Sequence, residues 1–200
     1  YAFGCSLKDS NTLLEDKLKH AADYVEALYQ NWYLKELTGC WTKAISDNLA
    51  ALGYVSEIGK QRDFYSHYVK PLAGKNSRAF VIISDALRYE VAAELCDTIT
   101  RTTKGTAKLD AVQAVFPSIT KFGMAALLPG RRLSVNDGMD VLVDEMPTRS
   151  TDERGKVLRA ANINSVAVQY TDVLNMKRAE RRELVSGKEI VYIYHNTIDA

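Results

Sequence analysis

Four side chains with catalytic or metal-binding chemistry stand where apolar runs of the sequence end. Asp85 follows the run "AFVIIS", Thr120 follows "VFPSI", and His195 and Asp199 follow "EIVYIY". Carboxylates and imidazoles hold divalent cations, and a hydroxyl beside a cation is more readily deprotonated to a nucleophile. These residue types are the set that a metal-assisted phosphoryl or sulfuryl transfer requires.

The elements that would position these residues alternate in type from residue 78 onward. Strands are expected at "RAFVIIS", "AKLDAVQAVF", "SVAVQY" and "EIVYIY", and helices at "ALRYEVAAELCDTI", "TKFGMAALL", "NMKRAERRELVSG" and after the capping box of Ser150 and Glu153. "RAFVIIS" is typical of a strand covered on both faces of a parallel sheet. The alternation predicts an α/β sandwich, in which ligands bind beyond the carboxyl ends of the strands.

The sequence before residue 77 has helical periodicity. Apolar residues in 11–37 recur at steps of four and three, which predicts an amphipathic helix: Leu14, Leu18, Ala21, Val25, Leu28 and Trp32. We expect this stripe to pack within a globule, because the seam is too short for a typical coiled coil. "TGCWTKAISDNLAALG" predicts a turn and a second helix ended by Gly53, and "GKQRDFYSHYVKPLAG" a third. We therefore predict a helical region over 1–76 and an α/β region over 77–200.

Each candidate residue also has a structural interpretation. Asp85 could be the N-cap of the helix that follows it, since aspartate is favoured at that position. His195 could be a hydrogen-bonded structural group near a buried strand. Lys121, next to the candidate nucleophile, could contact a phosphate oxygen or be a solvated lysine on the first turn of a helix. The residues alone leave these alternatives open.

Composition narrows the functional classes. The chain carries 26 Lys and Arg against 25 Asp and Glu, a formal net charge of +1, which gives no global attraction to nucleic acid. Its three cysteines, Cys5, Cys40 and Cys96, have no paired spacing, which disfavours a disulfide framework or a cysteine zinc site and favours a reducing cytoplasm. No apolar run approaches the roughly 20 residues that span a membrane. No glycine-rich nucleotide loop follows any expected strand, so a nucleotide-binding module is a weaker hypothesis.

Three stretches carry a resemblance to a known family. "FVIISDALRYEVAAEL", "FPSITKFGMAALLPG" and "VYIYHNTID" resemble the PglZ family of bacterial phage-defence systems such as BREX, a branch of the alkaline phosphatase superfamily. The resemblance covers residues from about 60 to 200. It implies an α/β/α sandwich of alkaline phosphatase type, incomplete at its C-terminal end and preceded by an α-helical region. Thr120 also lies ten residues before Gly130, a spacing similar to that of the nucleophile helix in related phosphodiesterases and sulfatases.

The resemblance implies roles for individual residues. It makes Asp85 a metal ligand, Thr120 the nucleophile and a metal ligand, and Asp199 a ligand of a second metal. His195 and Lys121 would lie behind the ligands or contact the phosphate. The cofactors implied are divalent metal ions, with zinc favoured and magnesium or manganese as alternatives. The superfamily's remaining ligands would follow Asp199 and are absent from this sequence.

The resemblance also implies a biological setting. We expect a cytoplasmic, metal-dependent phosphodiesterase or phosphohydrolase that works with other subunits of a phage-defence complex, with DNA as a further candidate partner. The sequence starts with Tyr1 and stops shortly after an apolar run, so we expect a part of a longer protein that is inactive alone. The alternative is a non-catalytic scaffold subunit that keeps the fold and binds partners through its helices.

Overall fold

The computed structural model describes residues 15–74 and 77–198, with side chains described from residue 18 onward at the N-terminal end. The chain divides into two compact units, residues 1–56 and 57–200. This division falls after Ser56, earlier than the boundary expected from the sequence after residue 76. The two units are described separately.

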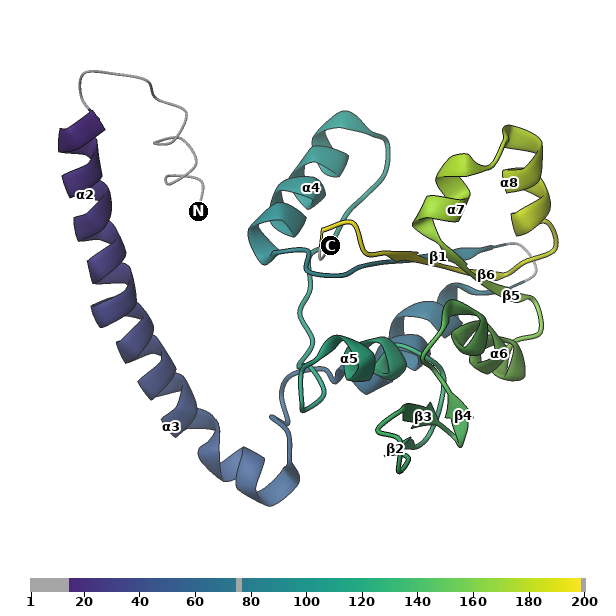
Figure 1. Ribbon diagram of the computed structural model, residues 1–200, viewed down its shortest axis with the longest axis horizontal. Coiled ribbons are helices and arrows are strands. Elements are labelled where there is room, and N and C mark those ends of the chain that lie inside the picture. Colours follow the sequence, from purple (N-terminus) through teal and green to yellow (C-terminus); the bar gives the residue numbers. More distant parts are fainter. Residues whose placement is uncertain (1–14, 75–76, 199–200) are drawn as a thin grey trace. The chain divides into compact units, whose positions relative to one another are not determined.

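The first unit is one continuous helical run. It consists of α2 (Glu15–Leu28), the π-helical segment η1 (Tyr29–Leu34) and α3 (Lys35–Leu52) (Figure 1). A π-helical turn takes one residue more than an α-helical turn.

The turn expected near Gly39 is wrong, because α3 runs through this glycine without interruption. The hydroxyl of Thr38 donates to the carbonyl of Leu34 at 2.6 Å, so even this polar residue bonds within the helix. The predicted end of the helix at Gly53 is confirmed. Gly53 adopts a left-handed conformation with φ of 73°, and its N–H donates to the carbonyl of Leu49.

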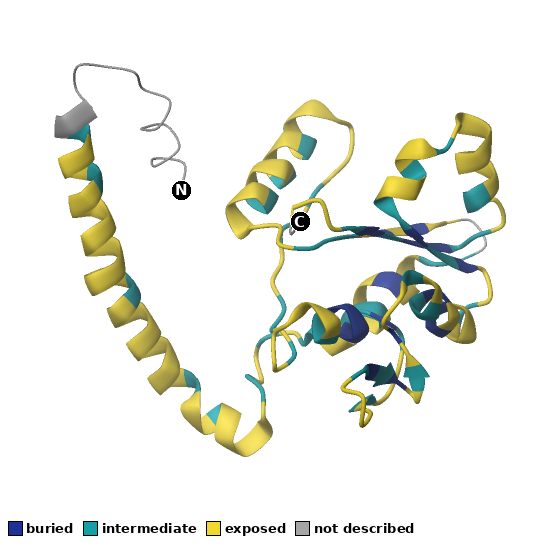
Figure 2. Ribbon diagram, in the orientation of Figure 1, coloured by how far each residue is buried: buried dark blue, intermediate teal, exposed yellow. Residues whose placement is uncertain are grey.

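The expected burial of the apolar stripe is wrong for its described members beyond Leu18. Val25 is 51% exposed, Leu28 42% and Trp32 64%. Leu18 is half-buried, and Leu14 lies outside the described residues. No residue from 18 to 56 is buried, as the colouring of α2 and α3 shows (Figure 2). The amphipathic pattern is present, but the described residues of this unit provide no second surface against which it could pack.

The second unit is built around a three-stranded parallel sheet. The strands are β1 (Ala79–Ser84), β5 (Ser165–Gln169) and β6 (Ile190–His195), and their order is β1-β6-β5. All three strands lie where the sequence predicted them. In the register Ala79 and Ser165 both align with Ile190, so the carboxyl ends of the strands meet at one edge.

Helices flank both faces of this sheet, so the predicted α/β class is confirmed (Figure 1). α6 lies on one face and α7 on the other, and the helical bounds are α4 (Tyr89–Thr102), α5 (Thr120–Ala126), α6 (Thr151–Ala161), α7 (Tyr170–Asn175) and α8 (Arg178–Val185). The capping box at α6 is confirmed: Glu153 N–H donates to Ser150 Oγ at 3.2 Å, and Ser150 N–H donates to the Glu153 carboxylate at 2.9 Å. None of the helices formed by described residues combines the length and apolarity that crossing a membrane requires.

The core lies on one face of the sheet, which we call the α6 face. Ile190, Tyr192 and Tyr194 of β6 point to this face and are fully buried. On the opposite face, the α7 face, Phe80 of β1 is 55% exposed and Ile82 67%. The expectation that β1 is covered on both faces is therefore wrong, because β1 is an edge strand whose α7 face has no covering element.

The strand expected at "AKLDAVQAVF" is also wrong. This segment forms no strand and makes a single isolated parallel bridge between Gln113 and Lys60. Its backbone hydrogen bonds go to residues 59–61 and not to the sheet. The third helix expected after Gly59 is present, but it consists of short segments of 3-10 and π type: the 3-10 helix η2 (Gln61–Asp63), the π-helix η3 (Tyr65–Val69) and the 3-10 helix η4 (Lys70–Leu72).

A small antiparallel sheet follows α5, in a region to which the sequence analysis assigned no element. Its strands are β2 (Leu133–Val135), β3 (Val141–Val143) and β4 (Met146–Pro147). Gly130 packs directly against Val143, where a Cβ atom would overlap the valine side chain. A glycine is therefore required at the end of the α5 segment, because any larger residue would displace β3.

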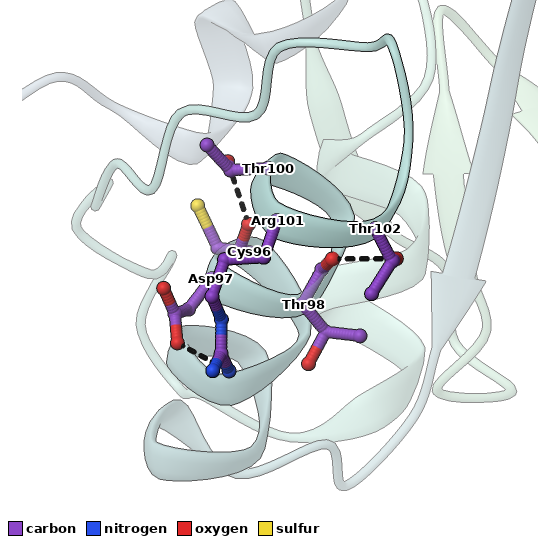
Figure 3. A network of polar contacts seen from close by, with 6 residues as sticks. All are labelled: Cys96, Asp97, Thr98, Thr100, Arg101 and Thr102. Atoms are coloured by element: carbon purple, nitrogen blue, oxygen red, sulfur yellow. Dashed lines mark hydrogen bonds and ion pairs between the residues drawn. The ribbon is translucent and has the colours of Figure 1, made fainter.

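Helix α4 is held mainly by contacts within itself (Figure 3). Arg101 pairs with Asp97 at 2.6 Å, and Thr100 Oγ1 donates to the Cys96 carbonyl at 2.9 Å. None of its residues is fully buried. Its exposed apolar side chains, including Leu95 at 51%, lie on the same unit as the open part of β1.

Candidate active site

A pocket of about 280 Å³ opens at the carboxyl end of β1. Four segments form it: the start of η2, the end of β1, the loop before α5, and α5 with the residue that follows it. The lining residues are Gln61, Ile83, Ser84, Asp85, Ala114, Ser118, Ile119, Thr120, Gly123, Met124 and Leu127. The pocket lies beyond the carboxyl end of a parallel strand, where open α/β sheets bind ligands.

Asp85 lies in the first turn beyond β1 and is half-buried. Its N–H donates to the carbonyl of His195 at 3.0 Å, which extends the β1–β6 pairing past the strand end. Its carboxylate accepts a hydrogen bond from the N–H of Ala86 at 3.1 Å. Helix α4 begins only at Tyr89, with Arg88 at the N-cap position. The N-cap interpretation of Asp85 is therefore wrong, and Asp85 is among the residues that line the pocket.

Thr120 is the first residue of α5 and lines the same pocket. Its side chain is exposed, and no hydrogen bond from another described residue engages its hydroxyl. The helix behind it is anchored by Met124, Ala125 and Ala126, which are buried. The structure thus brings a free hydroxyl and a carboxylate from two segments to one cavity.

His195 is not among the residues that line the pocket, but it contacts Ser84, which is. Its Nδ1 is hydrogen-bonded to Ser84 Oγ at 2.8 Å, across the β1–β6 pair. Tyr170 packs edge-on against the imidazole, with ring centroids 4.7 Å apart. The ring is therefore fixed by two neighbours, and Ser84 links it to the pocket. Ser84 was not among the residues predicted for the site, although its place at the end of β1 is a signal that could have identified it.

Lys121 points to a different element. Its ammonium donates to the carbonyl of Met139 at 2.8 Å, in the loop between β2 and β3. It is not among the residues that line the pocket. A contact between Lys121 and phosphate stays a prediction, and it would require the ammonium to leave Met139.

The donor set for a metal is only partly described. Asp199 lies outside the described residues. Within the described ranges, no cluster of three or more His, Cys, Asp or Glu side chains is close enough to hold a metal. Asp85 and Thr120 offer two oxygen donors, a chemistry that suits zinc and magnesium but falls short of the four ligands of a typical zinc site. The residues present therefore fit one part of a metal site.

Strand β6 carries two buried tyrosines, Tyr192 and Tyr194. Tyr192 donates its hydroxyl to the carbonyl of Leu127, a pocket residue, at 2.9 Å. Burial raises the pKa of Tyr192. Burial also raises the pKa of Tyr194 to about 12, with the guanidinium of Arg154 opposing part of that rise. Both phenols are therefore neutral at physiological pH.

Comparisons with known proteins agree with this architecture. Residues 64–200 match the model of the family described as the BREX system PglZ alkaline phosphatase-like domain. The chain is 39% identical over 189 residues to "Alkaline phosphatase-like protein PglZ" of Bacillus cereus (strain H3081.97), an alignment that covers 94% of this chain and 22% of the relative. It is 41% identical over 188 residues to "Alkaline phosphatase-like protein BrxZ" of Escherichia coli O9:H4 (strain HS), covering 92% of this chain and 22% of that protein.

No solved structure matches the chain significantly. The chain spans about a fifth of the length of the two curated relatives. The family model, in contrast, covers most of the chain, including β1, α5 and β6. The chain therefore belongs to the BREX system PglZ alkaline phosphatase-like family.

Proposed function

We propose that this chain supplies one part of the active site of a metal-dependent phosphodiesterase or phosphohydrolase. The observation that carries the proposal is the shared pocket of Asp85 and Thr120 at the carboxyl end of β1. A carboxylate beside an unengaged hydroxyl is an arrangement that nucleophilic phosphoryl transfer requires.

In this proposal, Asp85 and Thr120 would hold a divalent cation through their oxygens, and Asp199 would contribute to a second one. The cation would neutralise charge on the phosphate and favour the deprotonated hydroxyl. Thr120 Oγ then forms a bond to phosphorus while the ester oxygen leaves with its electron pair. Water hydrolyses the phosphothreonine and restores the hydroxyl. Zinc is the favoured ion, and magnesium and manganese are the alternatives.

The proposed setting is defence against phage, because the matched family is named for the BREX system. The partners would be other subunits of a defence complex in the cytoplasm, and a nucleic acid is a candidate substrate. His195 and Ser84 would stand behind the metal ligands, since their hydrogen bond lies next to the pocket.

A second candidate function is that of a scaffold. The observation that favours it is the exposed apolar stripe of the first unit, where Val25, Leu28 and Trp32 are each at least 42% exposed. Exposed stripes of this kind mark sites of protein association. A scaffold would keep the pocket without turning over a substrate.

Hydrolysis of bis(4-nitrophenyl) phosphate by the longer protein tests the proposal, with Zn²⁺, Mn²⁺ or Mg²⁺ added in turn. We expect Thr120→Ala to abolish hydrolysis and Thr120→Ser to keep part of it, because serine restores the attacking oxygen. Thr171→Ala, at an exposed threonine of α7, is the matched control and should keep the wild-type rate. Full activity in Thr120→Ala would exclude Thr120 as nucleophile, and an inactive wild type would favour the scaffold.

A further inference from the structure

Two segments that are far apart in the sequence are hydrogen-bonded to each other beside the pocket. Residues 59–61, which lead into η2, run parallel to residues 113–115, which lead toward α5. Gln113 N–H donates to the Gly59 carbonyl at 2.8 Å, and Gln61 N–H donates to the Gln113 carbonyl at 3.0 Å. These two bonds form a short parallel ladder that fixes the loop before α5.

The side chain of Gln61 extends this ladder and joins it to α5. Its Oε1 accepts a hydrogen bond from Val115 N–H at 3.1 Å, in the place where the next backbone carbonyl of the ladder would accept. Its Nε2 donates to the carbonyl of Gly123 in α5 at 3.4 Å. One half-buried amide therefore uses both of its ends, and it also lines the pocket.

The contact on α5 falls in the turn that carries Thr120. Gly123 lies three residues after Thr120, and its N–H donates to the carbonyl of Ile119 at 3.1 Å. A Cβ atom at position 123 would lie 3.4 Å from Gln61 Nε2, so the glycine leaves room for the amide. A restraint on Gly123 is thus a restraint on the first turn of α5.

We infer that Gln61 is a positioning residue: its amide clamps the loop before α5 to the first turn of α5 and so holds the Thr120 hydroxyl against the pocket. Gln61 precedes residue 64, where the match to the family model begins. The inference therefore extends the site to a segment outside the matched domain. Its kinetic consequence rests on the proposed function, whereas its structural consequence does not.

Two substitutions distinguish the effects of the two hydrogen bonds that the Gln61 amide makes. Gln61→Glu keeps an acceptor for Val115 N–H but places a carboxylate oxygen against the Gly123 carbonyl. Gln61→Met keeps the length of the side chain and loses both bonds. Gln30→Met, at an exposed glutamine of the first unit, is the matched control. If the hydroxyl is misplaced, kcat should fall while KM changes little, since substrate binding does not need the nucleophile.

Two measurements on the longer protein test the clamp. Gln61→Met should lower kcat for bis(4-nitrophenyl) phosphate by roughly 10- to 100-fold, with KM within about threefold of wild type, and Gln61→Glu should be intermediate. In hydrogen–deuterium exchange, peptides spanning 111–126 should exchange faster in Gln61→Met, while peptides of α6 stay unchanged.

The outcomes distinguish this inference from the proposed function. If wild type hydrolyses the ester and Gln61→Met keeps its kcat, the clamp is excluded and the proposed function stands. If wild type is inactive, the exchange measurement decides alone: unchanged exchange over 111–126 would overturn the clamp. If Gln61→Met does not fold, Gln61→Glu carries both measurements.

Discussion

Strands β6 and β1 lie side by side and are both rich in apolar residues, yet they are buried differently. β6 is the central strand: Ile190, Val191 and Tyr192 are fully buried, so both of its faces are covered. β1 is an edge strand, and its α7 face exposes Phe80 and Ile82. An apolar sequence thus sets how much area a strand is able to bury, whereas its neighbours in the fold set how much it does bury.

The largest effect that this comparison predicts is a pair of identical substitutions on adjacent strands. In the 200-residue chain, Ile190→Ala should cost about 2–5 kcal/mol of unfolding free energy, because it opens a cavity in the core. Ile82→Ala, at a residue that is 67% exposed, should cost less than about 1 kcal/mol. Urea unfolding of both variants measures the difference. Equal losses would show that β1 is covered on its α7 face as well.

A smaller effect separates the two buried tyrosines of the α6 face. Tyr192→Phe removes a donor and leaves the Leu127 carbonyl without it, which should cost about 1–2 kcal/mol. The hydroxyl of Tyr194 is buried without a hydrogen-bond partner among the described residues. Tyr194→Phe should therefore change the unfolding free energy by less than about 0.5 kcal/mol or raise it. A reversed order in chemical denaturation would contradict this account of the core.

The same tyrosines predict how stability depends on alkaline pH. The folded-state pKa of Tyr194 is raised to about 12 from an ordinary value of 10.0, so folding favours the protonated phenol. The contribution of Tyr194 to the unfolding free energy should therefore be constant below pH 10 and fall between pH 10 and 12, as the unfolded chain loses protons first. Tyr194→Phe should make this fall shallower, which denaturation at a series of alkaline pH values measures. An unchanged slope would show that Tyr194 is ionised in the folded state.

The smallest effect is expected in the first unit. Leu28 is 42% exposed, so Leu28→Ala should lower the unfolding free energy by less than about 0.5 kcal/mol. The slightly higher helix propensity of alanine offsets part of this loss. Leu158→Ala in α6, at a residue with no exposed surface, is the matched contrast and should cost several-fold more. A large loss for Leu28→Ala would show that the stripe of the first unit is packed in solution.

Local signals predicted much of the fold. Apolar runs located β1, β5 and β6, the capping box located the start of α6, and Gly53 and Gly187 marked the ends of two helices. These features depend on residues close in sequence. The burial of β1 and of the first helix depends on residues far away in the sequence, so local patterns predicted more burial for both than the structure shows.

The residues of the candidate site also differ in how well the sequence predicted them. Asp85 and Thr120 could be selected because each stands at the start of a turn after an apolar run, and both line one pocket. Ser84 and Gln61 were missed, since their contacts join residues 111 and 54 positions apart. The segment 107–116 was expected to be a strand, yet it pairs with residues 59–61. In all three cases, contacts between residues far apart in the sequence determine the structure, and local sequence patterns do not show such contacts.

The most direct test of the central claim is the metal dependence of hydrolysis in Asp85→Asn. In the longer protein, the rate with bis(4-nitrophenyl) phosphate is measured against Zn²⁺ or Mn²⁺ concentration for wild type, Asp85→Asn, Thr120→Ala and the surface control Asp47→Asn. We predict that Asp85→Asn needs at least about 10-fold more metal for half-maximal rate, because a ligand is lost, while Asp47→Asn follows wild type. Thr120→Ala should stay inactive at every concentration. A wild-type metal curve for Asp85→Asn would contradict a shared metal site of Asp85 and Thr120.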